Sequence, residues 1–177
     1  MNPRTSRPSL AWAALALCMM FLTGHASVQR NINGQVLGGG APMSHSTVTL
    51  WEAIGGTPRK VAQTTTNADG RFQLDGKASS GDTSFYLLAT GGVPRGKSAN
   101  NPHVVLLAVV GSNPPAQVVV DEMTTIASVI THTQFINGAA VKGSPLALRI
   151  AAGNVSNFVD LKTGDYSATI LDPLRSC

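Results

Sequence analysis

Residues 61–74, VAQTTTNADGRFQL, decide the fold because they join two β-prone runs through a turn. The first run is rich in β-branched residues, which strands favour. The NADG that follows is a strong turn signal, and Gly70 can adopt a positive φ at little cost. Phe72 and Leu74 then alternate with polar residues, as in a strand with one buried face. This stretch predicts a β-hairpin in which the second run returns alongside the first.

Other short β-like runs lie on both sides of this hairpin. Residues 85–89 and 104–110 are continuously apolar, which predicts strands covered on both faces. The seven expected strands lie at 32–37, 47–51, 61–66, 71–74, 85–89, 104–110 and 117–120. Seven short strands separated by turns predict a mainly β fold, a seven-stranded antiparallel sandwich over residues 27–120. We expect Phe72 and Leu88 in its core.

After residue 120 the apolar spacing changes to that of helices. The stripe of a first helix, ended by a glycine at 138, consists of Met123, Ile126, Ala127 and Ile130. Ser144 before Pro145 predicts the start of a second helix, because the hydroxyl can cap it and proline suits its first turn. The looser second stripe consists of Leu146, Ile150, Val155, Phe158, Val159 and Leu161. Residues 121–177 are therefore expected to form a two-helix segment with a short C-terminal strand or tail, the strand at 166–171.

These two apolar stripes need cover. A helix of this length is marginal in water unless one face is buried. Two helices packed on each other would leave part of both stripes exposed. We expect residues 121–164 to dock on the outer face of one sandwich sheet or to self-associate through the remaining patch.

Residues 1–26 have the layout of a secretory signal peptide. Arg4 and Arg7 precede an apolar run at 10–22, and the small-residue exit GHA follows. The run is too short to span a bilayer comfortably, so an uncleaved N-terminal anchor is the lesser alternative. We expect cleavage between Ala26 and Ser27 and an exported protein, periplasmic or extracellular.

The mature chain would carry little charge and one cysteine. Charged residues make up 12% of the sequence, and loss of the two signal arginines lowers the net charge from +4 to +2. Lys and Arg are scattered, which argues against a nucleic-acid partner. His25 stands where a lipoprotein would carry its lipid-bearing cysteine, so we expect a soluble product without a membrane partner. Cys18 leaves with the signal, which leaves Cys177 without an intrachain partner.

Three motifs of the β region resemble a known module. They are IxGxV at 32–36, TxxxDGxF at 65–72 and YLLAxGG at 86–92. Together they resemble the markers of carboxypeptidase regulatory-like, or transthyretin-like, domains. The resemblance implies an immunoglobulin- or transthyretin-like sandwich. This fold occurs in many secreted proteins, so it indicates little about function.

Two motifs of the helical region carry a second resemblance. Residues 120–129, VDEMTTIASV, resemble a VNExTTxA segment of bacterial exported proteins, and residues 152–164, AGNVSNFVDLKTG, resemble their AxNxxNLVDxxTG stretch. In longer relatives this module precedes NHL-type β-propeller repeats. The present sequence contains no propeller, so no binding role of a propeller is carried over.

Candidate acidic sites are better explained by structure. Glu122 lies at a predicted helix start, where an acid complements the helix dipole, so we favour this role over a functional acid. Asn67 and Asp69 fit an ordinary turn better than a calcium site, which needs about six to eight oxygen ligands.

The histidines also lack a catalytic or zinc-binding pattern. Those outside the signal segment are His45, His103 and His132, and none has a partner at helical zinc spacing. Ser44-His45-Ser46 is no triad, because neighbours on a strand point to opposite faces and no GxSxG elbow occurs. Hydroxyisourate hydrolase is an enzyme among transthyretin-like proteins, but its terminal YRGS motif is absent here. We expect no catalytic residues, no metal site and no cofactor.

Two classes of function remain. The first is a non-catalytic exported β-sandwich protein with a structural or surface-interaction role, its partner an unknown protein or glycan. The alternative is a carbohydrate- or small-ligand-binding module. Val48 and Leu50 can share a buried face while Trp51 points the other way. Trp51 is therefore the candidate stacking platform for a sugar, although it has no neighbouring aromatic residues in the sequence.

Overall fold

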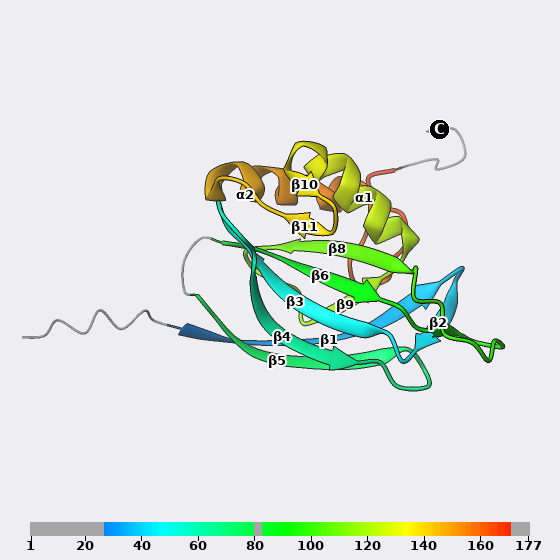
Figure 1. The fold of residues 1–177 in the computed structure, drawn as a ribbon. Coiled ribbons are helices and arrows are strands. Elements are labelled where there is room, and N and C mark those ends of the chain that lie inside the picture. Colours follow the sequence, from blue (N-terminus) through cyan, green and yellow to red (C-terminus); the bar gives the residue numbers. More distant parts are fainter. Residues whose placement is uncertain (1–26, 80–82, 171–177) are drawn as a thin grey trace, which may run out of the picture.

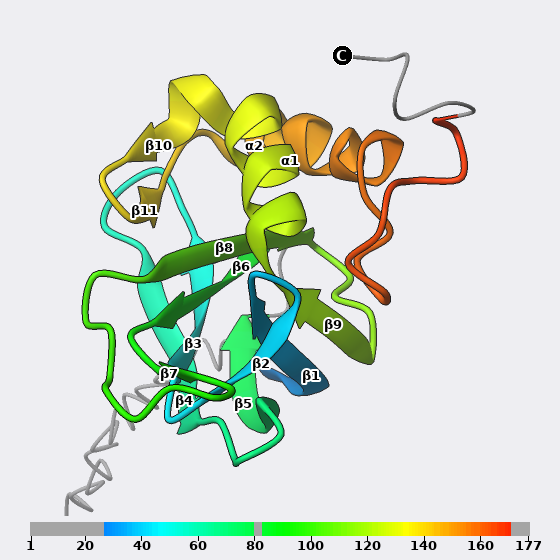
Figure 2. The ribbon, with the colours of Figure 1, turned by 90° about the vertical axis from the view of Figure 1, so that its right-hand side faces the viewer.

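The computed structural model describes residues 27–79 and 83–170 (Figure 1). Two β-sheets face each other, and a layer with two helices covers the outer face of one of them (Figures 1 and 2). The mainly β fold with antiparallel sheets and two helices is as the sequence predicted. The predicted signal segment, its cleavage site after Ala26 and the terminal Cys177 lie outside the described residues.

The first sheet is built around the N-terminal strand. Its order is β5-β1-β2-β7, and β9 pairs with β1. The strands are β1 (Ser27–Gly38), β2 (Ala41–Ser44), β5 (Arg71–Ser79), β7 (Val93–Pro94) and β9 (Gln117–Val120). The pairing of β9 with β1 is parallel, which departs from the predicted antiparallel arrangement.

The second sheet is antiparallel throughout. Its order is β4-β3-β6-β8. The strands are β3 (Thr47–Ala53), β4 (Arg59–Thr65), β6 (Ser84–Thr90) and β8 (Val105–Gly111). β6 and β8 are buried at almost every position, as their continuous apolar runs predicted.

The described residues contain eleven strands rather than seven. The additional ones are β2, β7, β10 (Ile136–Asn137) and β11 (Ala140–Val141). Gly39 and Gly40 lie between β1 and β2 and take positive φ values of 57° and 75°. Two such residues in succession suit the tight turn of a hairpin, which here joins β1 to β2.

The turn at residues 67–70 forms, but the predicted hairpin is wrong. Gly70 has a φ of 69°, and the side-chain oxygen of Asn67 accepts hydrogen bonds from the backbone N–H groups of Asp69 and Arg71 at 3.0 and 2.9 Å. However, β4 pairs with β3 and β5 pairs with β1, so this turn carries the chain from one sheet to the other. A turn motif fixes a local reversal and leaves open which sheet the next strand joins.

The main core lies between the two sheets. Its large members include Ile32, Val36, Leu50, Phe72, Leu74 and Leu87. Phe72 is in this core as predicted, but Leu88 is not. Leu88 is only partly buried and packs on the opposite face of β6, against the second core. Successive residues of a strand alternate in direction, and the register of β6 gives the inward position to Leu87.

The helical segment docks on the outer face of the second sheet, the first of the two predicted alternatives (Figure 2). It comprises α1 (Glu122–His132), η1 (Thr133–Phe135), the β10–β11 hairpin, α2 (Pro145–Gly153) and η2 (Val155–Asn157). The second core joins Tyr86, Leu107 and Val109 of the sheet to Ala127, Leu148, Val155 and Val159 of this layer.

Only part of each predicted stripe is buried: Ala127 of the first stripe and Val155 and Val159 of the second lie in the second core, but the larger stripe side chains on α1 and α2 do not. Ile126 and Ile130 of α1 are 50% and 54% exposed, and Leu146 and Ile150 of α2 are 59% and 61% exposed. The buried positions of the two helices are Thr124, Ala127, Ser128, His132, Leu148 and Ala151. The apolar spacing therefore located the helices and only part of the side that meets the sheet.

The hydroxyl groups of α1 explain this choice of face. β8 is an edge strand, and its outward backbone N–H groups need acceptors. Leu107 N–H donates to the hydroxyl of Thr125, and Val109 N–H donates to the hydroxyl of Ser128, both at 2.9 Å. Each of these backbone donors would cost about 1–3 kcal/mol if it were buried without a partner, so the two hydrogen bonds favour turning the hydroxyl groups of α1 towards β8.

The two helical-region motifs meet at the start of α1. Asp121 caps the helix: its carboxylate accepts from the N–H of Thr124 at 2.8 Å, while the Thr124 hydroxyl accepts from the N–H of Asp121 at 2.9 Å. Gly164 packs against this cap, since a Cβ there would lie 2.2 Å from Asp121 Oδ2. Beyond it, Tyr166 makes a single bridge to Val159, and no strand forms at 166–170.

Candidate functional site

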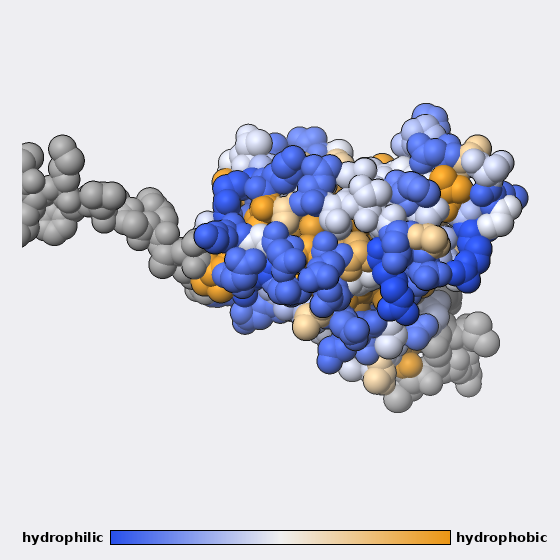
Figure 3. Space-filling view, turned by 90° about the horizontal axis from the view of Figure 1, so that it is seen from below, coloured by the Kyte–Doolittle hydropathy of each residue, from blue (hydrophilic) through white to orange (hydrophobic). Residues whose placement is uncertain are grey.

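The outer face of the first sheet is polar, and the helical layer does not cover it. Side chains of β5 alternate between exposed and buried, with Phe72 and Leu74 pointing inward and their polar neighbours outward. Viewed from below, this side of the molecule is mainly hydrophilic (Figure 3). The face is therefore open to a ligand or to water.

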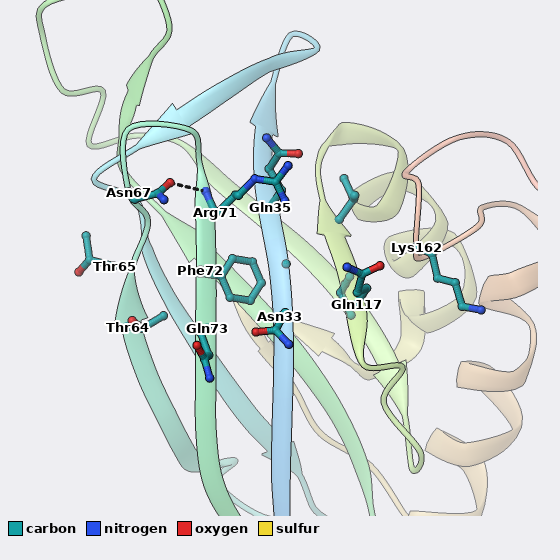
Figure 4. A pocket seen from close by; sticks show the side chains of 13 residues that line it. Asn33, Gln35, Thr64, Thr65, Asn67, Arg71, Phe72, Gln73, Gln117 and Lys162 are labelled. Carbon is teal, nitrogen blue, oxygen red and sulfur yellow. Dashed lines mark hydrogen bonds between the residues drawn. The ribbon is translucent and has the colours of Figure 1, made fainter.

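A groove of about 550 Å³ crosses this face (Figure 4). Its walls come from Thr64, Thr65 and Asn67 on one side and from Lys162 on the other. Strands β5, β1 and β9 lie between these walls. The groove thus collects residues from four distant parts of the chain.

Strand register places three side-chain amides in one row across the groove. Asn33 of β1 is opposite Gln73 of β5 and also opposite Gln117 of β9. Neighbouring strands are about 4.8 Å apart, so these amides repeat at that spacing. An amide offers two donors and one acceptor oxygen, which suits ligands rich in hydroxyl groups.

The second row of the groove carries an arginine. Gln35 is opposite Arg71 on one side and Val119 on the other. The Gln35 amide is held in place by donating to the backbone oxygen of Asp69 at 2.8 Å. Arg71 lies beside Gln35 at the upper end of the groove (Figure 4).

Several groove side chains have no partner within the part of the chain that the structure describes. No hydrogen bond or ion pair there engages the side chains of Asn33, Gln117, Arg71 or Lys162. Gln73 makes one long contact, from its Nε2 to a carboxylate oxygen of Asp75 at 3.4 Å. The polar groups of this groove are therefore available to a ligand.

The floor of the groove is backbone rather than apolar side chain. A Cβ on Gly34 would lie 2.3 Å from the backbone oxygen of Val118 and 2.4 Å from the Phe72 ring. Because residue 34 has no side chain, the ring of Phe72 can pack against β1 from the core side. Phe72 and Val118 are only 6% and 1% exposed, so the groove offers hydrogen bonds and no stacking surface.

Trp51, the predicted sugar platform, lies on the opposite side of the molecule, on the outer face of the second sheet. Its ring is stacked on Tyr86, with centroids 6.4 Å apart and planes 12° from parallel. The ring is partly buried against the second core, and its Nε1 is buried with no hydrogen-bond partner among the described residues. Trp51 is thus partly packed against Tyr86 and the second core, and its role as a stacking platform for a sugar stays a prediction.

The candidate acids are engaged in local structure. Glu122 accepts a hydrogen bond from the N–H of Gly39 at 2.8 Å, which ties the β1–β2 turn to the start of α1. The carboxylate of Asp69 pairs with Arg95 at 3.0 Å on the surface. Asn67 uses its oxygen for the turn described above, which agrees with the structural interpretation of this motif.

The histidines are dispersed. His45, in the left-handed region with a φ of 60°, contacts the hydroxyl of Ser44 at 3.2 Å, whereas Ser46 is buried and donates to the Gly91 carbonyl. His103 is exposed in the loop before β8. His132 is fully buried beneath α2, near Phe135. Among the described residues no group of three or more His, Cys, Asp or Glu could hold a metal ion.

Besides Tyr86, whose pKa is raised by burial, three buried titratable groups have shifted pKa values. Burial lowers the pKa of His132, although hydrogen bonds to backbone oxygens oppose the shift. Burial raises the pKa of Asp121 despite the hydrogen bonds of its cap. Burial would raise the pKa of Glu52, but hydrogen bonds from Thr83, Ser79 and Arg59, with the charge of Arg59, lower it overall. All three lie outside the groove and serve the fold.

Comparison with known proteins gives little guidance. No family model matches the chain, and no curated protein matches it. A solved structure of a 9R-lipoxygenase from Cyanothece PCC8801 is similar over 53% of this chain and 16% of its own, at 18% identity and a TM-score of 0.32. Among the described residues, neither helix is long and apolar enough to cross a membrane.

Proposed function

We propose that this chain is an exported, non-catalytic β-sandwich module of the immunoglobulin- or transthyretin-like type that binds a partner through the groove on its first sheet. One observation carries the proposal. Unpartnered polar side chains from three strands converge on the one sheet face that the helical layer leaves bare.

The chemistry of the groove supports binding rather than catalysis. Its lining side chains are amides, hydroxyls, one arginine, one lysine and buried apolar groups. Arginine and lysine stay protonated near neutral pH, and amides do not titrate. A general acid or base would need a group that changes protonation near the working pH. The arrangement is suited to holding a polar ligand.

The sandwich type is supported by what the motif residues do. Gly34 of IxGxV allows the close packing beneath the groove, and Gly70 of TxxxDGxF makes the turn between the sheets. Seven of the strands, β1, β3, β4, β5, β6, β8 and β9, would form the common framework, with β2 and β7 as additions.

Export is a separate part of the proposal and has its own test. The support is the arginine-flanked apolar run of residues 1–26. N-terminal sequencing of the chain recovered outside the cytoplasm is expected to begin at Ser27. A soluble fraction that begins at Met1 would contradict cleavage after Ala26.

The binding role is tested with arrays of oligosaccharides and of peptides, probed with the full chain. We expect at least one ligand to be retained by the unaltered chain and lost by the double variant Asn33→Ala and Gln117→Ala. Gln29→Ala is the matched control, because Gln29 is an exposed amide on β1 in line with Asn33 but away from the groove. Ligands that bind all three proteins equally, or no ligand at all, would contradict the proposal.

A further inference from the structure

We propose that the ligand of this groove is an acidic polysaccharide, a chain of sugars that carry carboxylates. This inference rests on the proposed function, because it assigns a ligand class to the same groove. It draws on three features: the charges at the two sides of the groove, the amide row between them and the missing apolar pocket.

The charges that line the groove are all positive. Arg71 lies on the β5 side and Lys162 on the side of the loop after η2 (Figure 4), and no Asp or Glu is among the described lining residues. Acids near the rim are otherwise engaged: Asp69 pairs with Arg95 at 3.0 Å, and Asp160 accepts from the N–H of Lys162 at 2.8 Å. Asp75 is exposed on the same face of β5, and its carboxylate accepts a long hydrogen bond from Gln73 of the amide row at 3.4 Å. A guanidinium can hold a carboxylate through two parallel hydrogen bonds, so anionic groups fit both sides.

The amide row supplies partners for the uncharged part of such a ligand. Gln73, Asn33 and Gln117 span two strand spacings, roughly 10 Å, which exceeds the length of one sugar ring. Each amide can donate to one hydroxyl and accept from the next. The row therefore fits consecutive sugars of a chain better than a single small molecule.

A peptide fits this groove less well. Peptide recognition in extended form uses the backbone of a sheet edge and apolar pockets for side chains. The amide row instead crosses the strands on the sheet face, and the apolar lining residues Phe72, Val118 and Val119 are at most 9% exposed. A polyhydroxyl ligand needs neither an edge nor a pocket.

The test is titration of the full chain with an oligogalacturonate and with its fully methyl-esterified, uncharged counterpart. We expect the acidic oligosaccharide to bind, to bind more weakly at high salt and to bind more tightly than the ester. Arg71→Gln and Lys162→Gln are each expected to weaken binding about tenfold, the usual loss of one charge-assisted hydrogen bond. Lys77→Gln is the matched control, because Lys77 lies on the same face of β5 outside the groove.

Failure of this inference and failure of the proposed function give different results. Equal binding of acid and ester, no binding of the oligogalacturonate, or equal losses in Arg71→Gln and Lys77→Gln would overturn the acidic polysaccharide. So would an acidic peptide that binds in its place. In each of these cases the binding role stands if an array ligand is lost in the Asn33→Ala and Gln117→Ala variant, and falls if none is.

Discussion

The two sheets differ in what lies on their outer faces. The second sheet turns Tyr86, Leu107 and Val109 outward, and the helical layer covers them. The first sheet turns amides and charged groups outward, and neither helix of the described residues covers it. The difference is visible in the strands: β8 is apolar at every position but its last, whereas β5 is apolar only at alternate ones. One outer face is covered by the helical layer, and the other is polar and exposed among the described residues.

The largest expected effect concerns the packing of the helical layer, and it tests whether α2 contacts the second core through its buried side. Leu148→Ala removes a fully buried side chain from the second core and is expected to lower the free energy of unfolding by about 2–5 kcal/mol. Leu146→Ala, on the 59% exposed side of the same helix, should change it by less than about 0.5 kcal/mol. Chemical denaturation measures both. Similar losses in the two variants would mean that α2 is docked by the other face.

The second prediction concerns the packing beneath the groove. Gly34→Ala would place a Cβ 2.3 Å from the backbone oxygen of Val118, so β1 or β9 must shift. We expect a loss of about 1–3 kcal/mol, typical of overpacking. Gly56→Ala is the control, because nothing lies within 4 Å of the added Cβ and its φ is not positive. A Gly34 variant as stable as this control would refute the close approach of β1 and β9.

The third prediction tests the edge of the second sheet. Ser128→Ala removes the acceptor of the Val109 N–H and should cost about 1–3 kcal/mol, the usual cost of a buried unpaired donor. Val129→Ala, at a 43% exposed site on the same helix, should cost far less. Native-state hydrogen exchange gives a second measurement, since the Val109 amide should exchange faster only in the Ser128 variant. Unchanged exchange would show that another group satisfies this amide.

The smallest expected effect is a pH dependence. Folding lowers the pKa of His132 below its unfolded value of about 6.5, so the unfolded chain binds the proton more tightly. The stability that the neutral His132 contributes is therefore fully present above the unfolded pKa. It is lost as the pH falls from the unfolded pKa towards the folded pKa, by at most about 1.4 kcal/mol per pH unit. Denaturation at pH 7.5 and 5.5 measures it.

Two variants identify the group responsible. His132→Gln should reduce the difference in stability between the two pH values, and His103→Gln, at an exposed site, should leave it unchanged. An unaltered difference in the His132 variant would assign the pH dependence to another group.

Local features of the sequence predicted the elements well. The strand positions followed from alternation and apolar runs, and α2 begins at the predicted Ser144 cap with Pro145 in its first turn. These features depend on near neighbours in the chain. The buried helix faces followed only in part, because hydroxyl groups of α1 accept hydrogen bonds from N–H groups of β8, a contact that the spacing of apolar residues does not reveal.

The candidate site was beyond prediction for a related reason. Asn33 and Gln117 are neighbours only because β9 pairs with β1 in parallel, and no local sequence pattern indicates that pairing. Trp51 was chosen for its residue type, but its exposure depended on a helical layer whose docking surface was unknown. The outward polar positions of residues 33, 35, 71 and 73 were the signal that the sequence did contain.

The most direct test of the contrast between the two outer faces is NMR mapping of amide shifts when the full chain is titrated with the oligogalacturonate. The account predicts shift changes concentrated at Asn33, Gln35, Arg71, Gln73 and Gln117, with the amides of α1 and α2 unmoved. Changes centred on the exposed helix residues Ile126, Ile130 and Ile150 would contradict it, since they would place the binding surface on the outer side of the helical layer and not on the first sheet.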